Sequence, residues 1–167
     1  LICHMQSVPE TPHAIMPSIE QTIEFIRSAH EGQLDKAGKS YWQHPVAVMQ
    51  RLGAEAADNE KLTALLHDVI EDTSHTADDL RALGYPEDVV EAVMLLSRPP
   101  GVAYLAWIAS IAASGNRLAI RVKIADNEEN CDPARVAALP PDLRRLASRY
   151  ERSLEILRPA LGNAQSL

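Results

Sequence analysis

Apolar side chains recur at helical spacing along most of the chain. Ile19, Ile23 and Ile26 share one face of the first such segment. Ser18 and Gln21 form a capping-box pattern at its start. The same spacing, with proline at helix starts and glycine after helix ends, marks further segments. The helices predicted in this way cover about 18–30, 45–52, 59–70, 76–83, 86–96, 104–113, 116–132 and 140–158.

One of these segments has an ambiguous pattern, because the apolar positions 118, 120, 122 and 124 alternate as they would in a half-buried strand. A helix is favoured there, since the chain has almost no hairpin turns that could pair such a strand. We therefore predict an all-α fold. The expected organisation is a compact helical bundle forming one domain at 17–162, with a flexible arm at 1–16 and a tail at 163–167.

The composition is that of one globular domain. The chain has 167 residues and is 46% hydrophobic, which allows one sizeable core but makes two ordinary domains improbable. The formal net charge of -7 and the pI of about 5.3 disfavour nonspecific binding to nucleic acid or to an anionic membrane, because both need an excess of Lys and Arg. We expect neither partner.

Cysteine usage and the start of the chain bear on location. Cys3 and Cys131 are too few for a disulfide framework or a thiolate zinc site. No apolar run approaches the roughly 20 residues of a membrane span, and the start lacks a secretory signal pattern. We interpret the segment 1–5, which does not open with Met, as a cloning remnant and leave it out of the fold prediction. These features predict a cytoplasmic protein.

The stretch 65–73 places acids and an imidazole inside an apolar helix. Burying such charges without compensation is costly, so a partner must neutralise them. Glu71 follows His67 by four residues and therefore lies on the same face, and Asp72 has the same relation to Asp68. His67 and Asp68 can bind a cation, while the carboxylates of Glu71 and Asp72, one turn later, lie near a reacting water. In isolation, the His-Asp pair would instead indicate a capped or salt-bridged helix end.

Two more residues give this stretch a metal-binding context. His44 directly precedes Pro45 at a predicted helix start, where its ring can point into the bundle. Asp126 lies in another mostly apolar helical run. Two imidazoles and two carboxylates suit an octahedral first-row divalent ion better than structural zinc, so manganese or iron is expected. Spacing alone leaves open whether His44 and Asp126 meet His67 and Asp68.

These motifs resemble the HD-domain hydrolases of the RelA/SpoT type, and among them the small stand-alone alarmone hydrolases similar to the metazoan SpoT homologue. The resemblance covers about 19–158, and the string His-Asp-Val-Ile-Glu-Asp-Thr at 67–73 is specific. It implies a compact helical fold, one manganese ion and removal of the 3′-pyrophosphate from guanosine tetra- or pentaphosphate. The roles it implies are His44, His67, Asp68 and Asp126 for the metal, Glu71 and Asp72 for the attacking water, Asn130 for the nucleoside, and Lys36 as the basic residue of the loop before the His-Pro motif.

The chain departs from the family pattern near the expected base site. Asp35 precedes Lys36 where an Arg-Lys pair is usual, which weakens the case for guanine and leaves adenine open. Asn127 stands where Arg or Lys is usual. Lys36 and Lys123 are still expected to bind phosphate or ribose.

Three further residues could lie either at the surface or at the substrate, and two further functions are compatible with the sequence. For Arg98, Arg149 and Tyr150 the sequence favours solvated surface positions over a part in substrate binding. Two alternative functions stay open: an HD-type nucleotide phosphatase or nucleotidase acting on another phosphorylated nucleotide, and a non-catalytic nucleotide-binding module. The expected partner is a small-molecule nucleotide in each case, and the sequence does not specify the oligomeric state.

Overall fold

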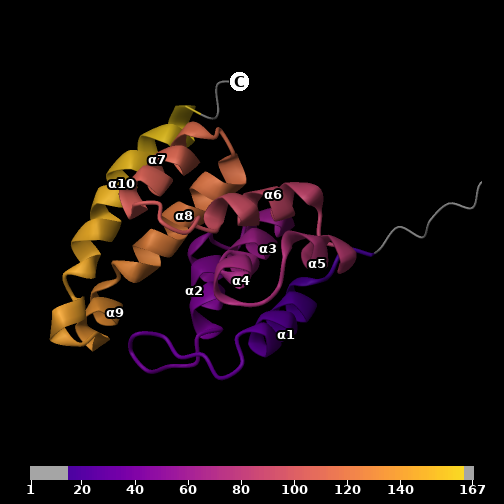
Figure 1. Cartoon of the computed structure of the whole chain (residues 1–167), viewed down its shortest axis with the longest axis horizontal. Coiled ribbons are helices and arrows are strands. Elements are labelled where there is room, and N and C mark those ends of the chain that lie inside the picture. The colour runs from indigo at the N-terminus through magenta and orange to yellow at the C-terminus, as the bar shows by residue number, and fades with distance from the viewer. Residues whose placement is uncertain (1–14, 164–167) are drawn as a thin grey trace, which may run out of the picture.

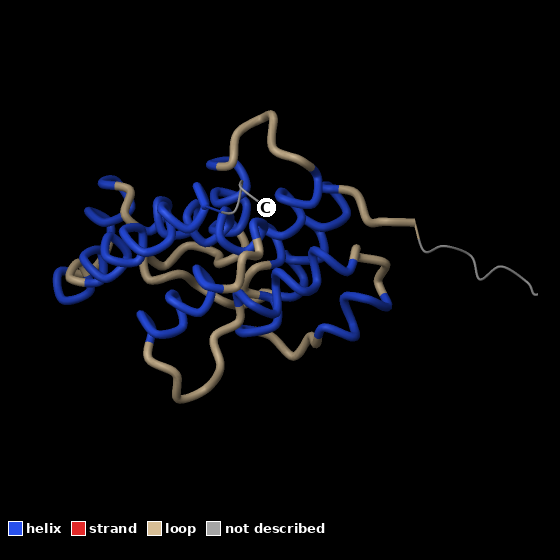
Figure 2. The backbone as a smooth tube through the Cα atoms, turned by 90° about the horizontal axis from the view of Figure 1, so that it is seen from above, coloured by secondary structure: helices blue, strands red, loops and turns tan. Residues whose placement is uncertain are grey.

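The computed structural model describes residues 15–163, and its regular elements are helical. The elements are α1 (Ile19–Ala29), α2 (Gln43–Arg51), α3 (Asp58–Leu66), α4 (Val69–Asp72), α5 (Ala77–Ala82), α6 (Glu87–Leu96), α7 (Tyr104–Ala113), α8 (Arg117–Asn130), α9 (Pro133–Ala138), the 3-10 turn η1 (Pro141–Leu143) and α10 (Leu146–Asn163). Over residues 15–163 the chain forms helices and loops without a named strand (Figure 2), so the all-α prediction is confirmed. The predicted arm and tail lie almost wholly outside the described residues.

Helix α8 is the central element of the bundle. It packs against α2, α3, α6, α7 and α10, and Figure 1 shows α10 along one side of the molecule with α1 and α5 on the other. Its buried residues, from Ala119 to Asn127, face several directions. A helix covered on most sides needs no single apolar stripe. This explains the strand-like alternation in the segment, and the helix prediction is confirmed.

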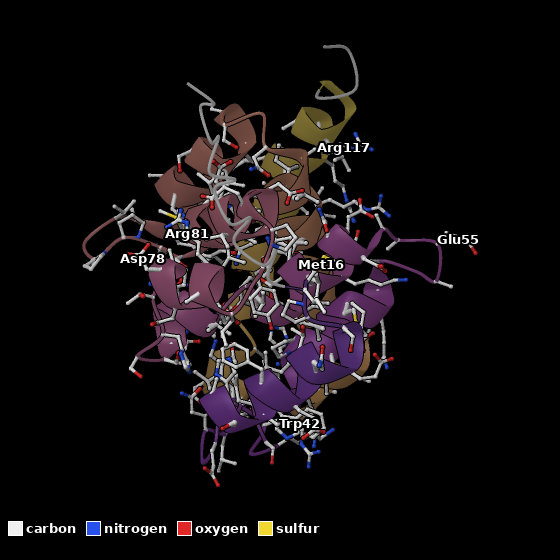
Figure 3. The ribbon with its side chains drawn as sticks, turned by 90° about the vertical axis from the view of Figure 1, so that its right-hand side faces the viewer. Met16, Trp42, Glu55, Asp78, Arg81 and Arg117 are labelled. Atoms are coloured by element: carbon white, nitrogen blue, oxygen red, sulfur yellow. The ribbon has the colours of Figure 1, made fainter. Side chains whose placement is uncertain are left out.

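Two apolar clusters form the core. One joins α6, α7, α8 and α10 and includes Ile120 and Leu157, which are fully buried. The other joins α1, α3, α5 and α6 and includes Leu65. Charged pairs such as Arg81 and Asp78, 2.8 Å apart, lie on the outside (Figure 3). No helix in the described part of the chain has the length and apolarity needed to cross a membrane.

The segment predicted as one helix over 59–70 is divided, so that prediction was wrong in detail. Helix α3 ends before His67, and α4 begins after Asp68. The Nδ1 atom of His67 donates a hydrogen bond to the Ala64 carbonyl at 2.7 Å. In a continuous helix that carbonyl accepts from the backbone N–H of Asp68. The break lets two consecutive side chains face the same site.

The last helix also differs from the prediction of 140–158. Pro141 begins η1, and α10 continues through Pro159. A proline inside a helix removes one hydrogen bond and costs about 3 kcal/mol or more. Ala160 and Leu161 nevertheless pack against the core, and this burial offsets the cost.

Candidate functional site

The four predicted metal ligands converge from three parts of the fold. His44 lies in the first turn of α2, His67 and Asp68 lie between α3 and α4, and Asp126 lies on α8. The His44 Nε2 atom is 3.0 Å from Asp126 Oδ1. The His67 Nε2 atom is 2.9 Å from Asp68 Oδ2 and 3.8 Å from Asp126 Oδ1. We call these four residues the His-Asp cluster.

The His-Asp cluster has the donor atoms of a metal site. His44, His67 and Asp68 each offer one ligand atom, and these atoms lie within 4.8 Å of one another. Asp126 is not in that trio but contacts both imidazoles. Imidazole nitrogens with carboxylate oxygens suit first-row divalent ions. The site therefore fits a divalent metal ion.

The hydrogen bonding of His67 supports this fit. A carbonyl oxygen can only accept, so His67 Nδ1 must carry the proton that is donated to Ala64. In neutral His67 the lone pair of Nε2 then faces the Asp68 and Asp126 carboxylates, an unfavourable contact unless a positive charge lies between them. Burial opposes protonation, but the two carboxylates outweigh it and raise the pKa of His67 to about 9. Either a proton or a metal ion must occupy this position.

The two carboxyl groups of the cluster are ionised. Burial by itself would raise their pKa values. The His67 imidazole beside Asp68 overcomes burial and holds the pKa of that carboxyl well below its usual range. The Lys123 ammonium, with His44 and His67, does the same for the pKa of Asp126. Both groups are therefore ready to bind a cation.

Lys123 and Asn130, predicted to contact substrate, both bind Asp126 in this structure. Lys123 Nζ lies 2.8 Å from Asp126 Oδ2 and 4.5 Å from the centre of the Trp107 ring. Asn130 Nδ2 donates to Asp126 Oδ1 at 2.8 Å. Both side chains orient the carboxylate, and both also line the cavity beside it.

Tyr41 contacts the cluster from the loop before α2, and sequence reasoning missed this contact. Its hydroxyl donates a hydrogen bond to Asp68 Oδ2. Burial and the neighbouring Asp68 carboxylate raise the pKa of Tyr41, so the phenol keeps the proton that it donates. Its position three residues before His44 was the available signal, but an aromatic beside a helix start more often packs in a core.

Glu71 and Asp72, the predicted catalytic residues, line the cavity beside the cluster. The Oε2 atom of Glu71 accepts a hydrogen bond from the backbone N–H of Arg98 at 2.8 Å, which ties α4 to the loop after α6. Burial raises the pKa of Asp72, and the negative charges of Asp68 and Glu71 raise it further. A carboxylate with a raised pKa is a stronger proton acceptor.

A cavity of about 340 Å³ opens in front of the cluster. It is lined by every predicted site residue except His67, which is buried behind it. Apolar side chains also line it, among them Leu34, Leu139 and Leu146. The volume lies in the range of small-ligand pockets, about 300–1,000 Å³.

A group of cations on the cavity wall lacks acidic partners. The Arg149 guanidinium lies 4.4 Å from the centre of the Tyr104 ring and 5.4 Å from that of Tyr150. The Lys36 Nζ atom lies 3.4 Å from the Tyr150 hydroxyl. Within residues 15–163, none of Lys36, Arg98 and Arg149 forms an ion pair with a carboxylate. Arg98 is exposed, as predicted, although it also lines the cavity. The surface positions predicted for Arg149 and Tyr150 were wrong, because α10 brings the partly buried Arg149 and the buried Tyr150 to the cavity only in the folded chain.

Asp35 precedes Lys36 at the position where the family pattern differs, and it forms hydrogen bonds within its own loop. Its Oδ1 atom accepts hydrogen bonds from the backbone N–H groups of Ala37 and Lys39, each at 2.9 Å. Its Oδ2 atom lies 3.6 Å from the Arg135 guanidinium. Most of the acceptor capacity of Asp35 is therefore used within the protein.

Comparison with known proteins identifies relatives over most of the chain. The chain is 33% identical over 158 residues to the bifunctional (p)ppGpp synthase/hydrolase SpoT of Escherichia coli K12, and the match covers 89% of this chain and 22% of that protein. It is 34% identical over 152 residues to the guanosine-3′,5′-bis(diphosphate) 3′-pyrophosphohydrolase of Vibrio cholerae, covering 85% and 21%. The chain thus spans about a fifth of the length of these relatives. No model of a protein family matches the chain.

One solved structure has a similar fold. It is described as a metazoan ortholog of SpoT that hydrolyses ppGpp and plays a role in starvation responses. The TM-score is 0.70 at 22% identity, and the match covers 90% of this chain and 96% of that one. The chain is therefore similar in sequence, over most of its own length, to a segment that makes up about a fifth of these SpoT and 3′-pyrophosphohydrolase proteins, and it has the helical fold of the metazoan SpoT ortholog.

Proposed function

We propose that this protein is a manganese-dependent hydrolase that removes the 3′-pyrophosphate from an alarmone nucleotide such as ppGpp, pppGpp or ppApp. The observation that supports this most directly is the His-Asp cluster at the floor of a cavity, with the Glu71 and Asp72 carboxylates beside it. The names of the sequence relatives and of the structural neighbour point to the same reaction.

His44, His67, Asp68 and Asp126 would hold the ion. Bound there, a divalent metal supplies a nucleophile at neutral pH and stabilises charge on a phosphoryl oxygen. Manganese suits the mixed nitrogen and oxygen donors. Tyr41 and Lys123 each donate to one of the carboxylates and so fix which oxygen atoms face the cavity.

Proton transfer is assigned to the acidic pair. Water attacks the phosphorus joined to the ribose 3′ oxygen, and the bond between that phosphorus and the ribose oxygen breaks. Asp72, with its raised pKa, accepts the proton of the attacking water. Glu71, oriented by the backbone of Arg98, lies beside it and takes part in passing a proton to the departing ribose oxygen. The products are pyrophosphate and a nucleotide with a free 3′ hydroxyl.

The unpaired cations favour a substrate with a second phosphate group. Lys36, Arg98 and Arg149 present positive charge to the cavity without acidic partners, and phosphate oxygens are the usual ligands of such groups. A nucleotide carrying phosphates at both 3′ and 5′ positions can bind the His-Asp cluster and these cations together. A nucleoside monophosphate can occupy only one of the two.

A substrate panel tests the proposal. Purified protein with Mn²⁺ is incubated with ppGpp, ppApp and mononucleotides carrying a 2′-, 3′- or 5′-phosphate, and the products are resolved by ion-exchange chromatography. Intact pyrophosphate released from the 3′ position of ppGpp or ppApp is the expected result. Release of orthophosphate alone would instead identify a nucleotidase, and binding without product at high enzyme concentration would identify a non-catalytic module. The ratio of rates for ppGpp and ppApp determines the base preference.

A further inference from the structure

A hydrogen-bonded chain outside the metal cluster connects α1 to the carboxyl end of α4. Helix α4 is a single turn, and Asp72 is its last residue. A carbonyl at the end of a helix has no partner within that helix. The Gln33 side chain supplies one, because its Nε2 atom donates to the Asp72 backbone carbonyl at 2.9 Å.

The orientation of Gln33 depends on His30. With its amide nitrogen directed at Asp72, the Gln33 Oε1 atom faces His30 Nδ1 at a distance of 2.8 Å. An amide oxygen can only accept, so Nδ1 of His30 must carry a proton and donate it. Reversing the Gln33 amide would lose both hydrogen bonds. The Asp72 carbonyl and His30 Nδ1 therefore favour the same orientation of the amide, and His30 stabilises it from the side opposite α4.

His30 is itself held firmly in place. Its side chain is 1% exposed, and its ring lies 5.0 Å from the ring of Tyr41. Its Nε2 atom is buried without a hydrogen-bond partner among the described residues. Packing alone does not require an imidazole here, because an apolar side chain would fill the space without leaving a buried polar atom unpaired. The bond to Gln33 is the interaction that the imidazole provides.

We infer that His30 is a positioning residue for Asp72 and acts through Gln33. The inference rests on the proposed function, in which Asp72 accepts a proton. His30 touches neither the cavity nor the cluster, so its effect appears in the placement of Asp72 and not in metal binding. The loop from Gln33 to Tyr41 thus orients both ends of α4, with Tyr41 at Asp68 and Gln33 at Asp72.

Steady-state kinetics of matched variants test this. In His30→Leu the donor is lost while the packing on Tyr41 is kept, and in Gln33→Met the amide is lost. Each should lower kcat about 10- to 100-fold, the usual loss when a partner behind an active-site ligand is removed, with KM and manganese content unchanged. The double variant should be no slower than the slower single variant, because both break one link.

Recovery of kcat in a conservative variant distinguishes a positioning role of His30 from a purely structural role. In His30→Asn the amide nitrogen can take the place of Nδ1, and most of the kcat should return. The control is His75→Leu, another histidine packed on an aromatic ring at 5.0 Å but outside the cavity, and its kcat should equal that of the wild type. Wild-type kcat in both His30→Leu and Gln33→Met, or a loss in His30→Leu that Asn does not restore, would overturn the inference. If His30→Leu fails to fold, Gln33→Met on the loop decides the matter.

A measurement that does not depend on turnover distinguishes failure of the positioning inference from failure of the proposed function. If the wild type hydrolyses no alarmone, the proposed function fails, and NMR of the Gln33 side-chain amide decides the positioning inference alone. The proton that is donated to Asp72 should be protected from solvent exchange in the wild type and in His30→Asn, but should exchange more rapidly in His30→Leu. Equal protection in all three proteins would contradict the inference.

Discussion

At the scale of single residues, the two nitrogens of His67 have different partners. Nδ1 donates to Ala64, and Nε2 faces the carboxylates of Asp68 and Asp126. A proton and a metal ion therefore compete for Nε2, since a metal binds only the neutral form. Two further consequences follow from the same cluster.

The affinity for Mn²⁺ should depend on pH through His67. Its pKa in the metal-free protein is raised from 6.5 to about 9, so binding displaces a proton below that pH. The apparent affinity should rise by about tenfold per pH unit up to pH 9 and then level off. In the metal-free protein the protonated imidazole stabilises the fold, fully below pH 6.5, and this contribution is lost as the pH rises through 9. Calorimetric titration with Mn²⁺ at several pH values measures the affinity. An affinity that does not change with pH would contradict this prediction.

Two variants should affect metal binding and turnover differently. Asp68→Ala removes a ligand and should abolish stoichiometric manganese binding. Glu71→Gln should keep the metal and lower kcat by about 100- to 10,000-fold, the usual contribution of a general acid or base. Glu91→Gln, the same change at an exposed position of α6, serves as the control. Metal analysis and kcat are measured together, and full activity in both site variants would refute the assignment.

At the scale of elements, α8 and α10 place the two walls of the site. Helix α8 supplies Asp126, and α10 packs along it and supplies Arg149 and Tyr150 to the cavity. The short α4 supplies Glu71 and Asp72, and its separation from α3 leaves His67 and Asp68 at a turn. The contact between α8 and α10 includes buried apolar side chains, so their contribution to stability can be measured.

Leu157→Ala should destabilise the bundle strongly. Leu157 lies on α10, is fully buried and belongs to the cluster shared with α8. Loss of its side chain leaves a cavity and should lower the free energy of unfolding by about 2–5 kcal/mol. Urea denaturation followed by circular dichroism measures this. Leu83→Ala, at a side chain that is 46% exposed, should have a much smaller effect, and equal losses would show that burial on α10 is not the cause.

At the scale of the whole molecule, the His-Asp cluster joins segments that are distant in the chain. The ligands come from α2, the turn between α3 and α4, and α8. The unfolded chain does not hold them together, so the ion binds the folded state preferentially. Metal binding should therefore stabilise the entire bundle.

Manganese should raise the melting temperature. At a free concentration of about 100 times Kd, the stabilisation is about 2.7 kcal/mol, which corresponds to a rise in Tm of about 5–10 °C for a chain of this size. Differential scanning calorimetry with and without Mn²⁺ measures the shift. In Asp68→Ala the rise should vanish, and a shift of the same size in that variant would place the ion elsewhere.

The sequence by itself determined the helical class and most helix positions, because helical periodicity is a local signal. Ser18 and Gln21 form the predicted capping box for the same reason. Acidic and imidazole groups in or beside apolar runs also marked the four cluster residues as candidates, but their convergence was decided by the tertiary structure. The tertiary structure decided the rest. The break at His67 depends on a side-chain bond to Ala64, and the extension of α10 past Pro159 depends on burial. The cations of the cavity and the link from His30 to Asp72 join residues far apart in the chain, and spacing along a sequence carries no distance between such residues.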